Sequence, residues 1–321
     1  MVFQIRGSAR VPGPLGKNPG GMGEQLPGPL GRWLWDQQST PSGQTSAVKA
    51  AKKTTMPPPT NDQVSKDVHV VTWPLYNPSK KVPALEDVQQ SPFIANCPVA
   101  AILAALAFTR SMPQDILSET AATVLTDLSG LPQGTLSNPP PGTTISSSRF
   151  FTVKLTGGRF AGVDVPGGTV DVSDVLYTDD HDRGWSPLYM RDPNGQSIWA
   201  SIIEKALAVQ LKSYENFDAV DFKVNDFWEM ITGVKPGGLT IKNDTPLTEI
   251  TAAAKAATQV PSIGASKPDA KDVKFVTEFH AHTMMGLEGT KIKVYDPAKA
   301  KTILLAPTEF HHDFQAIYFR K

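Results

Sequence analysis

The chain has 321 residues, of which 40% are hydrophobic and 19% charged, and its 31 lysines and arginines balance its 31 aspartates and glutamates. This length suffices to bury a sizeable core in one large domain or in two lobes. A neutral chain without a basic stripe offers no electrostatic basis for binding nucleic acid or an anionic membrane, so we expect neither as a partner. The single cysteine excludes an internal disulfide and a CxxC pair, and it fits a reducing compartment.

Residues 1–66 are rich in Gly, Pro, Ser, Lys and Gln, and we expect them to form a disordered tail. The motif PGPLG occurs twice within them, and the second copy runs into RWLWD. This segment is either a flexible leader or a docking segment for a partner or an export machinery, with Trp33, Leu34 and Trp35 as the anchor.

No run of 18 apolar residues occurs, so no membrane span is expected. The four-residue apolar patch near the first residue is too short for the core of a signal peptide. We therefore expect a cytoplasmic protein, or one delivered into another cell by a route that uses no signal peptide.

Local patterns predict the elements of residues 67–321 in chain order. Residues 67–77 alternate like a strand, whereas CPVAAILAALAFTR (97–110) is apolar on nearly all faces and predicts a buried helix. RFFTVKL (149–155) and RFAGVDVPGG (159–168), joined by TGG, predict a hairpin, and YTDDHDRGW (177–185) predicts an acidic loop.

Two further helices are predicted, over 197–215 and 247–259. The remaining β-type runs are VKFVTEFHAHTMMG, KIKVYDP, KTILLAP and FQAIYFRK, which predict an antiparallel meander, with EFHHDF (309–314) as a polar turn. The pattern predicts an α+β domain over 67–321, with a helical lobe at about 67–255, an antiparallel β lobe at about 256–321 and a cleft between them.

Cys97 stands directly before a proline and the apolar run, so it should lie at a helix N-terminus. There the helix dipole stabilises a thiolate, and the backbone N–H of Cys97 faces any oxyanion formed at an attacked carbonyl. The alternative is a buried thiol that packs like alanine.

A nucleophilic cysteine needs a base nearby in space, and the chain has six histidines. His280 and His282 lie two apart in a strand-like run and should point to the same side. Asp296 follows on the next predicted strand, where its carboxylate could orient an imidazole. The same two histidines and Asp296 could instead hold zinc, although no third strong ligand follows from the sequence.

The motifs around these residues resemble those of a known family. QQSPFIANCPVAAILAALA, SIWASIIEKALAVQLKSYENF, FWEMITGV and FHAHTMMG stand in this order between about residues 85 and 300. Together they resemble the papain-like protease core of the calpain family, with Asn96 where aspartate is usual, Pro98 where tryptophan is usual, and Asp296-Pro297-Ala298 in place of Asn-Pro-Trp.

This resemblance implies a papain-like cysteine peptidase core that hydrolyses protein substrates. It makes Cys97 the nucleophile, His280 the base and Asp296 the residue that orients the base. Gln90 would be the oxyanion residue, although it lies seven residues before the cysteine, whereas the family's glutamine lies six before, at the position of Ser91.

Two other functions remain open: a transglutaminase-like acyl transferase, which the aspartate favours, and a catalytically inactive calpain-fold binding module. No cofactor is expected to be required. Calcium is compatible with the resemblance, but no D-x-D-x-D-G loop occurs and YTDDHD is the one acidic cluster offered.

Overall fold

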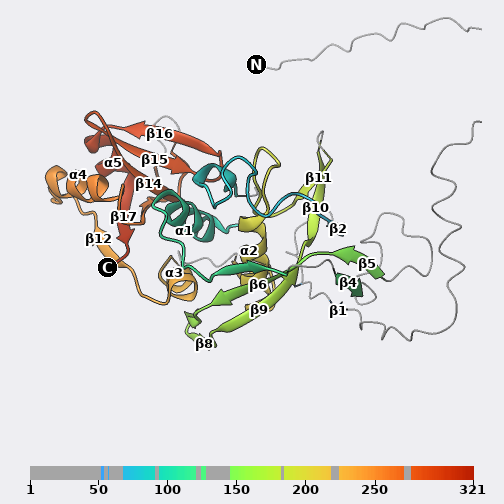
Figure 1. Cartoon of the computed structure of the whole chain (residues 1–321). Helices are drawn as coiled ribbons and strands as arrows, with labels where there is room; N and C mark the ends of the chain where they lie inside the picture. Colours follow the sequence, from blue (N-terminus) through green and yellow to red (C-terminus); the bar gives the residue numbers. More distant parts are fainter. Residues whose placement is uncertain are drawn as a thin grey trace, which may run out of the picture. The chain divides into compact units, whose positions relative to one another are not determined.

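The computed structural model describes residues 52–53, 57, 68–90, 94–120, 124–127, 145–181, 184–217, 224–270 and 276–321 (Figure 1). Its helices and antiparallel sheets give a mixed α and β protein, as the sequence predicts. The α-helices are α1 (Cys97–Phe108), α2 (Trp199–Gln210), α3 (Val224–Thr232), α4 (Leu247–Ala256) and α5 (Pro307–Asp313), with short 3-10 turns η1 (Leu85–Asp87) and η2 (Glu215–Phe217). None of the helices in the described ranges is long and apolar enough to cross a membrane.

The C-terminal part of the chain forms a six-stranded antiparallel sheet in the order β12-β17-β13-β14-β15-β16. The strands are β12 (Gly237–Thr240), β13 (Ser262–Ser266), β14 (Ala281–Glu288), β15 (Lys291–Asp296), β16 (Lys301–Leu305) and β17 (Phe314–Phe319). The predicted meander is confirmed from β13 to β16. The last strand, β17, returns to lie between β12 and β13, and the sheet takes its edge strand from residues before 256.

Helices cover both faces of this sheet, because the side chains along its strands point alternately into two apolar clusters. Ala281 of β14 belongs to the cluster that contains α1, whereas Met284 belongs to the cluster with α4 and α5. The hydroxyl of Thr283 donates a hydrogen bond of 2.9 Å to the carbonyl of Ala101, which ties β14 directly to α1. Figure 1 shows α1 against the sheet, close to α3.

Helix α1 is buried along almost its whole length, which confirms the prediction from its apolar sequence. Every residue from Cys97 to Ala107 is buried, so α1 has no solvent face. A helix of this kind requires neighbours on all sides, and here they include β13, β14, α2 and α3.

The part of the chain predicted as a helical lobe contains many strands as well. The sheet β3-β6-β9 is built from Leu117–Glu119, Phe150–Leu155 and Gly168–Ser173, and the sheet β11-β10-β2 from Gly184–Pro187, Val175–His181 and Val68–Val70. The predicted acidic loop at 177–185 is wrong for its described residues, because β10 and β11 pair there as a hairpin.

The predicted hairpin between 149–155 and 159–168 is also wrong. Strand β6 pairs with β9 and β3, while β7 (Gly158–Phe160) pairs with β8 (Val163–Val165) in a separate ribbon. Glycines close the base of this ribbon: Gly157 has φ +75°, and a Cβ on it would lie 2.3 Å from the nitrogen of Gly167. Because Gly157 and Gly167 approach so closely, the chain turns here and β7 pairs with β8 instead of joining the sheet of β6.

Two further segments differ from expectation. Residues 307–313 form helix α5 rather than a polar turn, with Pro307 in its first turn and the carboxylate of Glu309 accepting from the N–H of Ala306. Within the predicted tail, β1 (Lys52–Lys53) pairs with β4 (Val124–Asp127), which also pairs with β5 (Ile145–Ser148), and the carbonyl of Pro57 accepts from the hydroxyl of Tyr177. The rest of residues 1–66 lies outside the described residues.

Candidate active site

The thiol lies where the sequence predicts it. Cys97 is the first residue of α1, Pro98 follows in the first turn, and Asn96 precedes the helix. Cys97 is 6% exposed and forms no disulfide. Its side chain is therefore at the positive end of a helix that is held rigidly in the core.

His280 lies just before β14 and is fixed by its main chain. Its N–H donates to the hydroxyl of Ser266 (2.8 Å), and its carbonyl accepts from the N–H of Ser266 (2.9 Å). The preceding residue, Phe279, has φ +46°, a left-handed conformation that is strained for a residue with a side chain.

The structure brings Cys97, His280 and Asp296 together. The Nε2 of His280 lies 3.2 Å from the Oδ1 of Asp296, as an ion-pair contact without the alignment of a good hydrogen bond. The thiol of Cys97 lies close enough to the same ring to raise the pKa of His280. Because Nε2 faces the carboxylate, Nδ1 is the nitrogen left for the thiol.

The charges around His280 favour its protonated form. Burial lowers the pKa of His280, but Asp296 and Cys97 outweigh burial and raise it to about 9. Burial opposes ionisation of Asp296 in the same way, yet His280, His282 and Thr277 hold the pKa of this carboxyl well below its usual range. The site therefore contains an imidazolium next to a carboxylate at neutral pH.

Several donors hold the carboxylate of Asp296 at the end of β15. The hydroxyl of Thr277 donates to Oδ2 (2.7 Å), the N–H of Ala298 donates to Oδ1 (2.9 Å), and the Nζ of Lys299 lies 3.4 Å from Oδ2. A buried carboxylate needs such partners to remain charged. Ala298 thus contributes its backbone N–H to this carboxylate.

His282 lies beside the pair rather than in it. Its ring is edge-on to the ring of His280, with centroids 5.0 Å apart, and its Nε2 is 3.8 Å from the Oδ2 of Asp296. Burial and the neighbouring His280 lower the pKa of His282 to about 3, so it is neutral at physiological pH. In the described part of the chain, no group of three or more His, Cys, Asp or Glu residues is arranged to hold a metal ion.

The backbone of Gln90 is hydrogen-bonded to the residue that follows Asp296. Its N–H donates to the carbonyl of Pro297 (3.0 Å), directly after Asp296, while its side-chain Nε2 donates to the carbonyl of Ile94 (2.9 Å). One hydrogen of Nε2 is thereby occupied, and no hydrogen bond among the described residues joins this amide to Cys97 or His280, so the oxyanion role stays a prediction. Ser91, the other residue considered for this role, lies outside the described residues.

Sequence reasoning used the Glu-Lys-Ala motif of α2 only as a family match and missed its link to the nucleophile. The carboxylate of Glu204 accepts from the Nδ2 of Asn96 and from the N–H of Met190 (2.8 Å). Burial raises the pKa of Glu204 to about 8. Lys205 points elsewhere, to the carbonyls of Ser173 and Val175 (3.0 and 2.6 Å). The signal in the sequence was two adjacent charges within an otherwise apolar stretch of helix.

The acidic residues suggested for calcium, Asp179 and Asp180, belong to strand β10, and their side chains lie outside the described residues. No calcium ligand set is therefore assigned.

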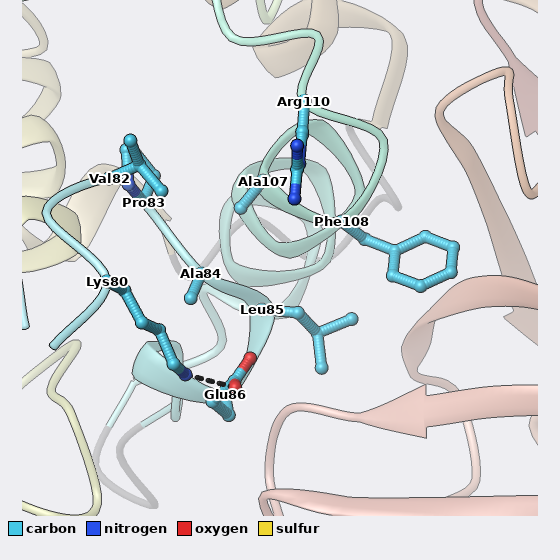
Figure 2. A pocket seen from close by; sticks show the side chains of 9 residues that line it. All are labelled: Lys80, Val82, Pro83, Ala84, Leu85, Glu86, Ala107, Phe108 and Arg110. Atoms are coloured by element: carbon cyan, nitrogen blue, oxygen red, sulfur yellow. Dashed lines mark hydrogen bonds and ion pairs between the residues drawn. The ribbon is translucent and has the colours of Figure 1, made fainter.

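A surface pocket of about 320 Å³ lies away from these residues. Figure 2 shows Phe108, the last residue of α1, and Arg110 on one side of the pocket, and the ion pair of Lys80 with Glu86 on the other. The thiol is at the opposite end of α1, about 18 Å along the helix axis for a helix of this length. The pocket therefore belongs to a different part of the surface from the Cys97 site.

No protein-family model matches this chain, and no curated protein matches it either. The resemblance to the calpain core therefore stays a prediction from the sequence motifs.

Proposed function

We propose that this chain is a cysteine endopeptidase of papain-like fold that hydrolyses protein substrates. The observation that carries the proposal is the buried group of Cys97, His280 and Asp296, in which one imidazole contacts a carboxylate and lies near enough to a helix-start thiol for that thiol to raise its pKa. The three groups come from a helix N-terminus and from two neighbouring strands of one sheet, an arrangement that suits nucleophilic catalysis.

In the proposed reaction, the proton of the Cys97 thiol resides on His280, and the thiolate attacks the carbonyl carbon of a peptide bond. A C–S bond forms as the negative charge moves to the carbonyl oxygen, which the N–H of Cys97 and the free hydrogen of the Gln90 amide stabilise. The C–N bond then breaks as His280 gives its proton to the leaving amine. Water, deprotonated by His280, hydrolyses the thioester and restores the thiol pair.

Asp296 keeps the Nε2 side of His280 occupied, so that the nitrogen facing the thiol exchanges the proton. Because Cys97 and His280 are only 6% and 4% exposed, a peptide substrate must displace neighbouring groups to reach the sulfur. We expect selective hydrolysis of accessible, extended segments rather than general digestion.

Alkylation of the thiol tests the catalytic pair directly. Iodoacetamide should label Cys97 faster than a free cysteine at pH 6, and His280→Ala should abolish this advantage, because the imidazolium that stabilises the thiolate is lost. His312→Ala serves as the control, since this histidine is exposed and contacts Asp313 instead. Slow labelling that is unaffected by His280→Ala would reject the catalytic pair.

A second function, acyl transfer to an amine, is favoured by one observation: the third member of the site is a charged aspartate. The two reactions share the thioester and differ in whether water or an amine attacks it. Incubation with casein and a fluorescent primary amine separates them. Casein fragments without bound dye indicate a peptidase, whereas intact casein carrying the dye indicates a transferase.

A further inference from the structure

Asn96 occupies the N-cap position of α1, yet it does not cap the helix. Asparagine is among the preferred N-cap residues because its side-chain oxygen accepts a hydrogen bond from the N–H groups of the first turn. Here the side chain makes no capping hydrogen bond, and φ −91° and ψ 17° differ from the extended conformation usual for a cap. Only the backbone carbonyl of Asn96 acts, accepting from the N–H of Ala100 (3.1 Å).

The side chain of Asn96 is held by α2 instead. Its Nδ2 donates to a carboxylate oxygen of Glu204, and its Oδ1 is buried without a hydrogen-bond partner among the described residues. Asn96 is 0% exposed, so water does not readily replace the missing partner. A buried acceptor without a partner destabilises the folded state. Asn96 would recover this cost by capping α1, and the contact with Glu204 keeps it from doing so.

Hydrogen bonds hold the side chain of Glu204 in place beside Asn96. It is 1% exposed, and its second oxygen accepts from the N–H of Met190, whose carbonyl in turn accepts from the hydroxyl of Ser201 (2.6 Å). The carboxylate therefore joins α2, the turn at Met190 and the residue before the nucleophile. No cation lies among its described hydrogen-bond partners, and burial raises the pKa of Glu204 to about 8, so this side chain is largely protonated at neutral pH while both of its oxygens still accept hydrogen bonds. Buried ionisable groups with strongly shifted pKa values are found mainly at functional sites.

We propose that Glu204 is a positioning residue for the nucleophile. By holding the side chain of Asn96 away from the N-terminus of α1, it leaves the first-turn N–H groups to the sulfur of Cys97 and to the oxyanion. This inference deepens the proposed function and rests on it. Glu204 acts through Asn96 and touches neither substrate nor thiol.

The test compares capping-competent and capping-incompetent residues at position 96 in the full chain. Asn96→Ser introduces a strong N-cap residue that is too short to reach Glu204, and we expect Cys97 alkylation by iodoacetamide at pH 6 to slow about 10-fold, the effect of one charge-assisted hydrogen bond. Asn96→Ala has no side-chain acceptor and should react within twofold of the wild-type rate. Asn243→Ala, at an exposed asparagine, controls for the loss of an amide.

Changing the other partner should give a matching result. Glu204→Gln leaves one acceptor oxygen for two donors, the Nδ2 of Asn96 and the N–H of Met190, so the hold on Asn96 weakens. We expect alkylation to slow about 10-fold, while kcat falls and KM stays within twofold. Adding Asn96→Ala to Glu204→Gln should restore alkylation to within threefold of wild type, a rescue that a merely structural role does not predict. Glu249→Gln, an exposed carboxylate on α4, is the matched control.

The results distinguish a failure of the positioning role of Glu204 from a failure of the proposed peptidase function. If wild-type labelling does not depend on His280, the proposed function itself fails. If that dependence holds but Asn96→Ser reacts at the wild-type rate, or as fast as Asn96→Ala, the positioning role is refuted. If Glu204→Gln does not fold, the Ser and Ala variants at position 96 still decide the question, because they leave the buried carboxylate in place.

Discussion

Replacing Asp296 with asparagine should change the protonation of His280 without removing its neighbour. Asparagine has nearly the same shape and keeps one oxygen that can accept a hydrogen bond, but it has no charge. The imidazolium of His280 would then lie in a buried site with a neutral partner. We expect the pKa of His280 to fall, because burial favours the neutral ring and Asp296 is the first of the groups that oppose it.

The size of the effect follows from the pKa of His280, which is raised from its usual 6.5 to about 9. At about 1.4 kcal/mol per pH unit, this difference amounts to about 3 kcal/mol, shared between Asp296 and Cys97. Removing the charge of Asp296 should lower the pKa of His280 by about 1–2 pH units. The free energy of unfolding should fall by about 2 kcal/mol through the loss of this ion pair.

The loss in free energy of unfolding caused by Asp296→Asn should depend on pH. His280 has a raised pKa, so its contribution to stability is complete below about pH 6.5 and disappears as the pH rises through about 9. Asp296 has a lowered pKa, so its contribution is complete above its usual pKa of about 4 and disappears as the pH falls further. The stability difference between wild type and Asp296→Asn should be largest between about pH 4 and 6.5.

Nuclear magnetic resonance of protein carrying ¹³C-labelled histidine measures the titration of His280 directly and requires no enzymatic activity. The signal of exposed His312, which contacts Asp313, should be the same in both proteins and serves as the control. A wild-type midpoint near 6.5, or a midpoint that does not move in Asp296→Asn, would refute the electrostatic reasoning.

Two predictions concern the frame that holds the site, and both are measured by denaturant unfolding. Gly157→Ala should destabilise the chain by more than about 2 kcal/mol, because the new methyl group meets backbone atoms, whereas Gly162→Ala, with φ +82° and nothing within 4 Å, should cost only about 1 kcal/mol. Equal losses for the two would show that the close approach at Gly157 is unimportant. Thr283→Val should cost about 1 kcal/mol by leaving the carbonyl of Ala101 without its donor, and an unchanged midpoint would contradict this assignment.

Local patterns were sufficient for the elements that carry the site. An apolar run without a polar face has to be buried as a helix, and α1 begins at Cys97 as the Cys-Pro pair indicates. Alternation and turn residues likewise marked β13 to β16 and the position of Asp296 at a strand end. These predictions succeeded because they depend on residues within one or two turns of each other.

Strand pairing could not be predicted in the same way. The TGG segment has the composition of a hairpin turn, but β6 finds its partner in β9, beyond the β7–β8 ribbon. The choice depends on the glycine contact between residues 157 and 167 and on the hydrogen bond from the N–H of Thr156 to the carbonyl of Met230 in α3. Neither contact leaves a local trace in the sequence.

By itself, the sequence determined the candidates: one thiol at a helix start, a histidine-bearing strand and a carboxylate at the end of the next strand. Only the tertiary structure decided that His280 contacts Asp296 and lies near Cys97 while His282 remains a neutral neighbour, and that Asn96 turns to Glu204, 108 residues away. The physical reason is that hydrogen bonds and ion pairs act over a few ångströms, so they depend on how helices and sheets pack. The sequence determines which side chains each helix or strand carries, and the packing of these elements determines which side chains come into contact.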